Sequence, residues 1–555
     1  MTIKITKEST QLVYVRWNTE DPMVCAECGS LVKYLYNDGG RFVITLLGTL
    51  NLYTCYYTCT NAKCIFAKPF TLPQDIVLPY KHYGLDVWHF AISSHIRFHD
   101  AYSAIADRLN EYFALEISPN TVKAMIETFL IASSHQAEQE TSKRVRKMGR
   151  IFLALDGQRP NNGGSGLWLF IDALTNRIVH MTYLKSASWE GLAKIFRIIE
   201  KKYGVSIEAV LSDHQKSVLK AVQKALPGVP HQFCHYHFLK NLHRDLNALD
   251  SHLHVQLAAA INGLYICHLP HSVVSNTLRK QGLDLREWTT PLANDLLALV
   301  QKRTRDFDIF AGFNLYQQLT QYVESIEQLF KTIKSTKRLV SIIGRTITAL
   351  KRALKAQKAL YLKVKALVPL FHECREILGA KTPSKEAIRK RAIRWQAHLQ
   401  HLHKTLTGRE VPPDLRYQSI TATTPLEEIL AEWVRLYSTH QEGLFHYLSL
   451  PGLPRSNVGV EKIFSVELHH FRTAAGKSQV GNQVRVKGGE FCVVLQHYDP
   501  DTITHVLLAQ DRSIIRAGRA QLRERQRQQS TSWHTKKARI PQILQLIERA
   551  KKLRI

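Results

Sequence analysis

The stretch Ile151–Pro160, IFLALDGQRP, decides how the rest of the chain is interpreted. Five apolar residues lead directly into Asp156, and polar residues with a glycine follow. Such a run is typical of a buried strand that ends at a carboxylate. A charge at that place is costly unless it is compensated, and a bound cation is the usual compensation. The stretch therefore raises the question of partner carboxylates, and the chain supplies Asp213 and Glu461.

Length and charge limit the classes of protein that this chain can belong to. With 555 residues it is too long for one core, so several domains are expected. The formal net charge of +29 indicates a polyanionic partner, and nucleic acid suits it better than a membrane surface. No apolar run approaches the ~18 residues of a membrane span, and the first residues lack the apolar core of a signal peptide. We therefore expect a protein that works inside the cell that makes it, without membrane insertion.

Cysteines cluster near the N-terminus, because five of the nine fall between Cys25 and Cys64. Cys25 and Cys28 form one close pair, and Cys59 and Cys64 form another after a strand-like stretch. Two thiol pairs on tight turns can complete a tetrahedron around zinc, with no open coordination position. Residues 1–70 are thus predicted to form a structural zinc ribbon, with Cys55 left over in a strand. The alternative is a set of free, buried thiols in a small core.

The next segment, 71–145, has the pattern of a helix-turn-helix DNA-binding domain. Ser118 followed by Pro119 is a helix start signal, since serine caps well and proline fits the first turn. Its exposed leading edge would offer Asn120, Thr121 and Lys123 to DNA. The alternative is an ordinary pair of antiparallel helices.

Residues 146–245 alternate between strand and helix patterns. Strands are expected over 151–156, 167–174, 177–184 and 207–213, with a fifth within 229–238. Helices are expected over 188–204 and 214–228, and Thr175-Asn176 would form a hairpin turn. If the fourth strand lies beside the first, Asp156 and Asp213 converge at one edge of the sheet. Asp172 is treated as an ordinary polar residue at a strand end.

The following 246–450 region is predicted to be helical and basic. Few acidic residues balance its cations, so a phosphate-facing surface is favoured over a solvated helix face. The candidate contacts there are Lys331, Lys334, Lys351 and Arg352.

A further helix is expected within 451–480, capped by Ser456 or Asn457 and ended by Gly476. Its predicted buried stripe consists of Val460, Phe464, Leu468 and Phe471. Glu461 and Arg472 lie beside this stripe, and Glu467 is a fallback for Glu461 on another face of the helix. The remaining 481–555 region is predicted to be basic, since 511–555 holds thirteen Lys and Arg against three Asp and Glu.

The order strand-Asp, strand-Asp, helix-Glu resembles the DDE transposases, whose catalytic domain has the ribonuclease H fold. VLSDHQKSV, around Asp213, is similar to the second-Asp motif of Mutator-like and related bacterial transposases. Cys234-His235-Tyr236-His237 resembles the Cys-x-x-His motif of that group, and SNVGVEKIFSVELHHFRTAAG resembles its terminal Glu-bearing helix. The resemblance covers roughly residues 20–480. We expect Cys234 and His237 to brace the core rather than to bind metal.

The resemblance implies a multidomain α+β protein with a ribonuclease H-like mixed sheet, interrupted by a large all-α insertion. It implies catalysis by Asp156, Asp213 and Glu461, whose hard oxygen ligands suit Mg²⁺ or Mn²⁺. Two such ions ~3.5–4 Å apart assist an in-line displacement at phosphorus.

The implied protein is a transposase of a prokaryotic insertion sequence, acting in the cytoplasm on the nucleoid. Its partners would be the double-stranded DNA of the element ends and target, bound by a homo-oligomer. Two alternatives remain: a domesticated DNA-binding protein without catalysis, and a ribonuclease H-like nuclease that cuts without joining.

Overall fold

The computed structural model describes residues 11–16, 23–158, 166–262, 310–332, 337–379, 384–412 and 419–528, with 300, 301 and 307. The chain divides into two compact units. Unit 1 comprises 1–210, 216–229 and 457–555, and unit 2 comprises 211–215 and 230–456. Among the described helices, none is long and apolar enough to cross a membrane.

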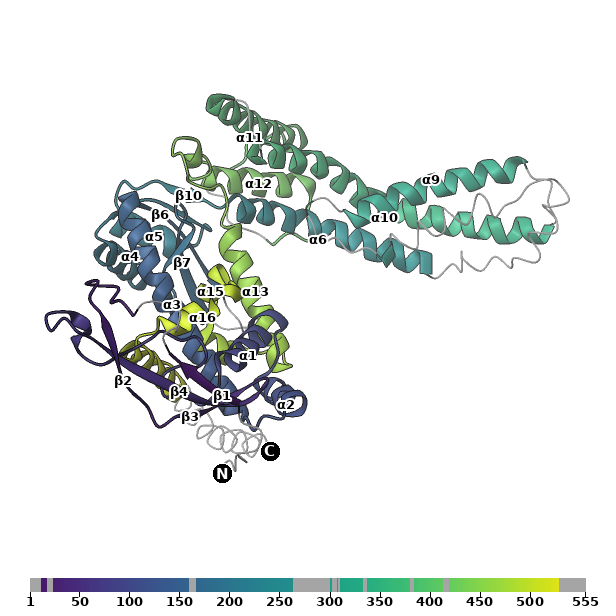
Figure 1. The fold of residues 1–555 in the computed structure, drawn as a ribbon. Coiled ribbons are helices and arrows are strands. Elements are labelled where there is room, and N and C mark those ends of the chain that lie inside the picture. The colour runs from purple at the N-terminus through teal and green to yellow at the C-terminus, as the bar shows by residue number, and fades with distance from the viewer. Residues whose placement is uncertain are drawn as a thin grey trace, which may run out of the picture. The chain divides into compact units, whose positions relative to one another are not determined.

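A small sheet near the N-terminus of unit 1 is built around one long strand, β4 (Gly48–Cys59) (Figure 1). It pairs in parallel with β1 (Gln11–Val15) and antiparallel with β2 (Val32–Asn37), β3 (Arg41–Thr45) and β5 (Phe70–Thr71). Gly48 adopts a φ of 123° in the turn between β3 and β4, which glycine permits. The short helix η2 (Ile65–Ala67) follows β4, and Cys55 lies within β4 as predicted.

Three helices follow: α1 (Leu85–Phe98), α2 (Tyr102–Phe113) and α3 (Pro119–Met148). The predicted start of α3 is confirmed, because the Ser118 hydroxyl accepts a hydrogen bond from the Thr121 amide at 3.2 Å. The helix is 30 residues long and ends at Gly149, so the polar segment from 136, whose sequence suits either a helix tail or a linker, continues the helix. Ala137, Thr141 and Val145 in its second half are buried, so the boundary expected near 145 falls within α3.

The second sheet has the order β10-β9-β6-β7-β8. Strands β6 (Arg150–Gln158), β7 (Gly166–Asp172) and β8 (Arg177–Leu184) form an antiparallel meander. Strand β9 (Ser206–Ser212) lies beside β6, and β10 (His231–Phe233) lies beside β9. The fourth predicted strand thus neighbours the first, which is the condition stated for the convergence of Asp156 and Asp213.

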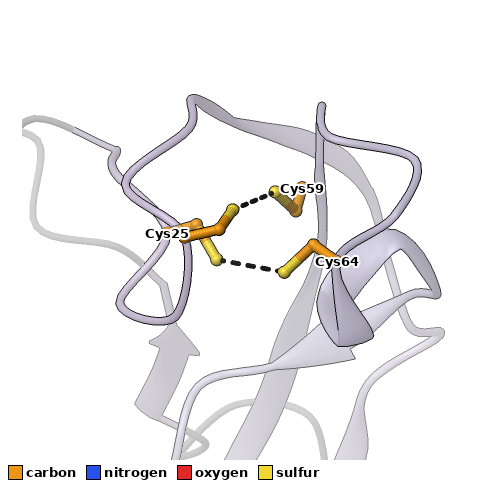
Figure 2. Close-up of side chains that lie close together, drawn as sticks. Cys25, Cys59 and Cys64 are labelled. Carbon is orange, nitrogen blue, oxygen red and sulfur yellow. Dashed lines mark hydrogen bonds between the residues drawn. The ribbon is translucent and has the colours of Figure 1, made fainter.

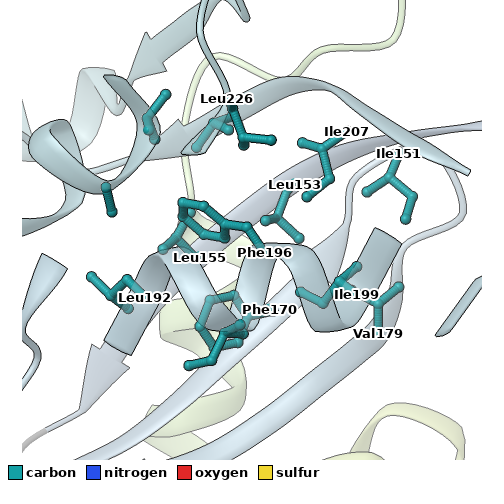
Figure 3. Packing of buried hydrophobic residues seen from close by; sticks show 14 of the residues in the cluster. Ile151, Leu153, Leu155, Phe170, Val179, Leu192, Phe196, Ile199, Ile207 and Leu226 are labelled. Atoms are coloured by element: carbon teal, nitrogen blue, oxygen red, sulfur yellow. The ribbon is translucent and has the colours of Figure 1, made fainter. Parts of the chain in front are cut away.

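Helices α4 (Trp189–Tyr203) and α5 (Lys216–Ala225) share one hydrophobic core with this sheet. Figure 3 shows Phe196 and Ile199 of α4 packed among Leu153, Leu155 and Phe170 of the strands. Burying such side chains stabilises the fold by roughly 1.5–3 kcal/mol each. This core fixes the backbone of β6 and thereby the place of Asp156.

Asp172 is fully buried and has a structural role. Its carboxylate accepts hydrogen bonds from the Phe152 amide at 3.0 Å and from the Thr175 amide and hydroxyl at 3.0 and 2.6 Å. The side chain thus ties β6 to the turn between β7 and β8, where Asn176 has a φ of 52°.

Unit 2 is helical in the described part of 246–450, in agreement with the prediction for that region. Helices α6 (His235–Asn262), α9 (Ala311–Thr332) and α10 (Lys337–Gly379) pack on one another, and α11 (Lys385–Thr407) packs on α12 (Leu426–His440) (Figure 1). The buried Asp250 carboxylate of α6 caps α9 by accepting from the Gly312 and Phe313 amides at 3.1 and 2.7 Å. A short 3₁₀ helix, η4 (His446–Leu448), follows α12.

The C-terminal part of unit 1 begins with α13 (Val458–Ala475), which ends at Gly476 as predicted. It continues through α14 (Gly481–Gln483), the π-helical turn η5 (Val484–Gly488), α15 (Gly489–His497), η6 (Pro500–Thr502) and α16 (Ile503–Leu508). A last helix occupies 512–528, and the final helix that the sequence QILQLIERAKKL predicts over 542–553 lies outside the described residues. The 512–528 helix is packed into unit 1, since Arg525 forms an ion pair with Glu490 at 2.8 Å.

Candidate functional site

The four predicted zinc ligands lie together. The Sγ atoms of Cys25, Cys28, Cys59 and Cys64 are all within 4.8 Å of one another. The Cys25–Cys64 and Cys28–Cys59 sulfur pairs are 3.7 and 3.5 Å apart (Figure 2). Four sulfurs about 2.3 Å from a tetrahedral zinc ion would be separated by roughly 3.8 Å. A disulfide requires about 2.05 Å, so the cluster fits a metal ion rather than two disulfides.

Local backbone turns place these thiols. The Cys25 amide donates to the Ser30 carbonyl at 2.8 Å, and Gly29 between them has a φ of 69°. Hydrogen bonds from the Ser30 side chain and backbone lower the pKa of Cys28 to about 6, whereas burial raises the pKa of Cys59 to about 12. Zinc binds thiolates, so loading of the metal-free cluster would release protons from the buried thiols.

Two of the predicted catalytic carboxylates belong to unit 1. Asp156 lies in β6 opposite Leu169 of β7, and its Oδ1 accepts from the Gly157 amide at 2.7 Å. Gly157 is required there, because a Cβ atom would lie 2.4 Å from the buried Trp168 ring. Glu461 lies in the first turn of α13. Both side chains are half-buried, which suits groups that must meet a ligand from solvent.

Two hydrogen bonds fix α13 against β6 on either side of these carboxylates. The Asn457 Nδ2 donates to the Leu155 carbonyl at 2.9 Å, and the Gln158 Nε2 donates to the Phe464 carbonyl at 2.9 Å. Asp156 lies between the two anchored positions of β6, and Glu461 lies between the two anchored positions of α13. The structure thus brings the segments that carry Asp156 and Glu461 alongside each other.

The C-terminal end of α13 is held by a chain of histidines. His95 Nδ1 donates to the Asp100 carbonyl at 2.8 Å, which leaves its Nε2 to accept from His470 Nε2 at 3.3 Å. The Nδ1 of His470 then accepts from His99 Nδ1 at 2.9 Å. Burial lowers the pKa of His95 to about 3, so it stays neutral, as this pattern requires. This contact between α1 and α13 could not be predicted from the sequence, because its histidines lie far apart in the chain.

Asp213, the third predicted carboxylate, belongs to unit 2 and directly follows the last residue of β9. It is half-buried, and its Oδ2 accepts from the Gln215 side chain at 2.7 Å. Nearby, the Cys234 amide donates to the Ser212 carbonyl at 2.8 Å, and the His235 ring bonds the Leu444 carbonyl at 2.6 Å. The segment after β10 is thus anchored by hydrogen bonds to the end of β9 and to the chain after α12.

The residues predicted to contact DNA from α3 are at its N-terminal end. Asn120 is exposed, and Thr121 and Lys123 are half-buried, with Lys123 3.8 Å from Glu127. The helix dipole adds positive potential at this end. The middle of α3, over 125–132, is largely buried, whereas the second half again exposes charged residues such as Lys143, Arg144 and Arg146.

The 512–528 helix packs against α3 and brings arginines next to its first turns. Gly518 packs on Ile131, and Arg519 donates to the Ala124 carbonyl at 3.1 Å and the Thr128 hydroxyl at 2.6 Å. Four further arginines on this helix are exposed: Arg512, Arg516, Arg523 and Arg527. Burial lowers the pKa of Lys81, and the positive charges of Arg519 and Arg512 lower it further. These three cations therefore lie near one another.

The other predicted DNA contacts lie apart from this region or outside the described residues. In unit 2, Lys331 and Arg352 are exposed, Lys351 forms an ion pair with Glu327, and Lys334 lies outside the described residues. In unit 1, the Arg472 Nε donates to the Ser478 carbonyl at 3.2 Å and so secures the end of α13.

The buried stripe of α13 differs from the prediction at one position. Val460, Phe464 and Phe471 are buried as expected, but Glu467 is fully buried where Leu468 was expected. Glu467 follows Val460 by seven residues and therefore lies on the same face of the helix. Helical spacing alone predicts the burial of Glu467. Selecting only apolar residues for the stripe places Leu468 there instead.

Part of the chain is similar to a known protein family. Residues 177–241 match a family model described as the MULE transposase domain. The matched segment runs from β8 to the first turns of α6 and includes Asp213. No curated protein matches the chain. The family match supports a transposase-type function, which implies DNA as a partner.

Proposed function

We propose that this protein is a DNA transposase that binds the ends of its mobile element and catalyses metal-dependent strand cleavage and strand transfer. The observation that carries the proposal is the transposase-domain match across the segment that holds Asp213. Its support within unit 1 is the pair of hydrogen bonds that set the Asp156 segment of β6 alongside the Glu461 segment of α13.

The proposed active site consists of Asp156, Asp213 and Glu461. Strand β9 neighbours β6 in the sheet, and the α4 crossover that leads into β9 is of the kind that joins parallel strands. Asp156 and Asp213 would then lie towards the same ends of adjacent strands. Hard carboxylate oxygens are the ligands that Mg²⁺ and Mn²⁺ prefer.

The chemistry would be two displacements at phosphorus in one site. Bound Mg²⁺ or Mn²⁺ would activate the attacking oxygen and stabilise the leaving oxygen. Water attacks first and releases a 3′-OH at the element's end, and that 3′-OH then attacks target DNA. The three carboxylates, held on rigid elements, fix where both reactions occur.

DNA would be held by several basic surfaces of the chain. The zinc module and the N-terminal end of α3, with Asn120, Thr121 and Lys123, would recognise the element's ends. The arginines of 512–528 and the cations of α9 and α10, including Lys331, Lys351 and Arg352, would add affinity that falls steeply with salt. Recognition and chemistry would therefore use separate surfaces.

The test uses the full-length protein and a duplex carrying the DNA that flanks its gene, with Mg²⁺ or Mn²⁺. A transposase nicks this duplex at a defined position and joins the released end to a second duplex. Chelation of the metal abolishes both products but leaves the complex in a gel-shift.

Each alternative gives a different result in the same assay. Cleavage without joining, even with a pre-cut 3′-OH end, would identify a nuclease. Specific binding without either product would identify a DNA-binding protein that has lost catalysis.

A further inference from the structure

Glu467 is a buried acid for which the proposed chemistry has no use. It is 0% exposed on α13, and neither carboxyl oxygen has a hydrogen-bond partner among the described residues. A Cβ atom on Gly488 would lie 2.5 Å from Glu467 Oε1, so the carboxyl is packed directly against η5. A buried, unpartnered carboxylate would be strongly destabilising, so the protonation state of Glu467 needs an explanation.

Gln158 of β6 carries hydrogen-bonding groups that complement those of a protonated Glu467. It follows Asp156 by two residues and therefore lies on the same face of the strand. One Nε2 hydrogen is used by the Phe464 carbonyl, whereas the buried Oε1 has no hydrogen-bond partner among the described residues. The side chain thus has one acceptor and one further donor to offer. The Gln158 amide lies close enough to the Glu467 carboxyl to oppose the effect of burial on its pKa.

The protonation state of Glu467 decides whether these two groups match. A neutral carboxylic acid has one donor and one acceptor, which complement the oxygen and the second N–H of a primary amide. An ionised carboxylate has acceptors only and would face the Gln158 oxygen without a proton to share. Burial raises the pKa of Glu467 to about 8, which keeps it protonated at neutral pH.

The charged neighbours of Glu467 on the adjoining elements are already engaged. Glu490 of α15 pairs with Arg525, and Lys487 of η5 bonds the Tyr102 hydroxyl. His470, one turn further along α13, belongs to the histidine chain, and burial keeps the Cys492 thiol protonated by raising its pKa. Asp156 of β6 carries the same sign of charge and would oppose ionisation of Glu467.

We propose that Glu467 acts as a protonated positioning residue, whose acid–amide pair with Gln158 holds α13 in register with β6. The functional part of this proposal rests on the proposed transposase activity. Asn457 anchors α13 before Glu461, and the Gln158–Glu467 pair anchors it after Glu461. Loss of the second anchor would let Glu461 move relative to Asp156 without altering either carboxylate.

The sign of the pH dependence follows from the raised pKa. The unfolded chain loses this proton near the ordinary value of 4.5, whereas the folded protein keeps it until about pH 8. The contribution of Glu467 to stability is therefore fully present below 4.5 and falls as pH rises towards 8. Above that pH the folded protein carries a charge at the β6–α13 contact, and positioning fails.

The test compares the wild type with Glu467→Gln, which keeps a donor and an acceptor but cannot ionise. In infrared difference spectra at about pH 7, the wild type should show the C=O stretch of a buried carboxylic acid, and Glu467→Gln should lack it. The thermal midpoint of the variant should exceed that of the wild type by a margin that grows between about pH 5 and pH 8. Absence of the acid band, or an equal pH dependence of both midpoints, would overturn the protonation proposal whether or not the protein is a transposase.

Activity tests the positioning role. Single-turnover cleavage by the wild type should decline above about pH 8, whereas Glu467→Gln should keep its rate there. Glu467→Leu, which removes the pair, should lose at least about tenfold in rate at every pH while its gel-shift is unchanged. Identical pH profiles of the wild type and Glu467→Gln would refute positioning through this proton. Absence of cleavage in the wild type would instead count against the transposase proposal and leave the spectroscopic test intact.

Discussion

At the scale of single residues, the four clustered thiols form a candidate metal site. Tight turns hold their sulfurs at spacings that suit a tetrahedron. Their positions follow from sequence because the pairs Cys25/Cys28 and Cys59/Cys64 are local, and only the β-sheet has to bring the two pairs together. Cys55 is close in sequence but is not one of the four clustered thiols, and its Sγ donates to the Asn37 Oδ1 at 3.1 Å. The module therefore offers its own control for a metal-binding experiment.

We predict about one zinc ion per chain, bound by the four clustered thiolates. The double substitution Cys25→Ser and Cys59→Ser should remove the zinc and unfold the module, because the metal supplies much of its folding energy. Cys55→Ser should retain the metal. Metal analysis of the purified proteins decides the matter, and a full zinc content in the double variant would refute the assignment.

The carboxylates show which side-chain roles cannot be predicted from the sequence alone. Asp156 and Asp172 both lie in apolar strands, but Asp172 is saturated by hydrogen bonds from Phe152 and Thr175, which only the folded turn supplies. The burial of Glu467 could be inferred from helical spacing, whereas its amide neighbour Gln158 lies 309 positions earlier and could not. Partners that meet only through tertiary packing leave no local signal.

At the scale of elements, the helix over 512–528 changes the expected picture of DNA binding. Composition alone predicts a basic C-terminal region. It cannot show that Arg519 and Arg525 form hydrogen bonds within unit 1. The periodic patterns around the second sheet did predict its strands and helices, whereas the adjacency of β6 and β9 was only a condition and is shown by the fold. The polar second half of α3 suits either a helix tail or a linker by its sequence, and the burial of Ala137, Thr141 and Val145 accompanies its continuation as a helix.

We predict that Arg512, Arg516 and Arg523 contact DNA phosphates. Replacing all three by glutamine should weaken duplex binding and reduce the slope of log affinity against log salt by about two to three. The matched control is the exposed triple Lys194→Gln, Arg197→Gln, Lys201→Gln on α4, which removes the same charge. Equal losses in the two triple variants would show that net charge, rather than this helix, determines affinity.

At the scale of the whole molecule, we propose that three carboxylates far apart in sequence act as one catalytic group. Asp156 and Glu461 are carried by neighbouring segments of unit 1, and Asp213 follows the strand next to β6. Residue order allowed these three to be proposed from sequence, but the hydrogen bonds that align α13 with β6 could be seen only in the fold. Groups that act as a unit lose function together, so substitutions among them should not be additive.

The most direct measurement is the single-turnover rate of cleavage and joining for Asp156→Asn, Asp213→Asn, Glu461→Gln and the double variant Asp156→Asn/Glu461→Gln. Each single variant should lose about 10³-fold or more in both reactions, the double variant should be no worse, and all should still bind the duplex in a gel-shift. Asp107→Asn, an exposed acid on α2, should react at the wild-type rate. Full activity of Glu461→Gln alone would mean that another acid completes the site. Cleavage by Asp156→Asn at the wild-type rate would contradict the proposal that the three carboxylates form one catalytic group.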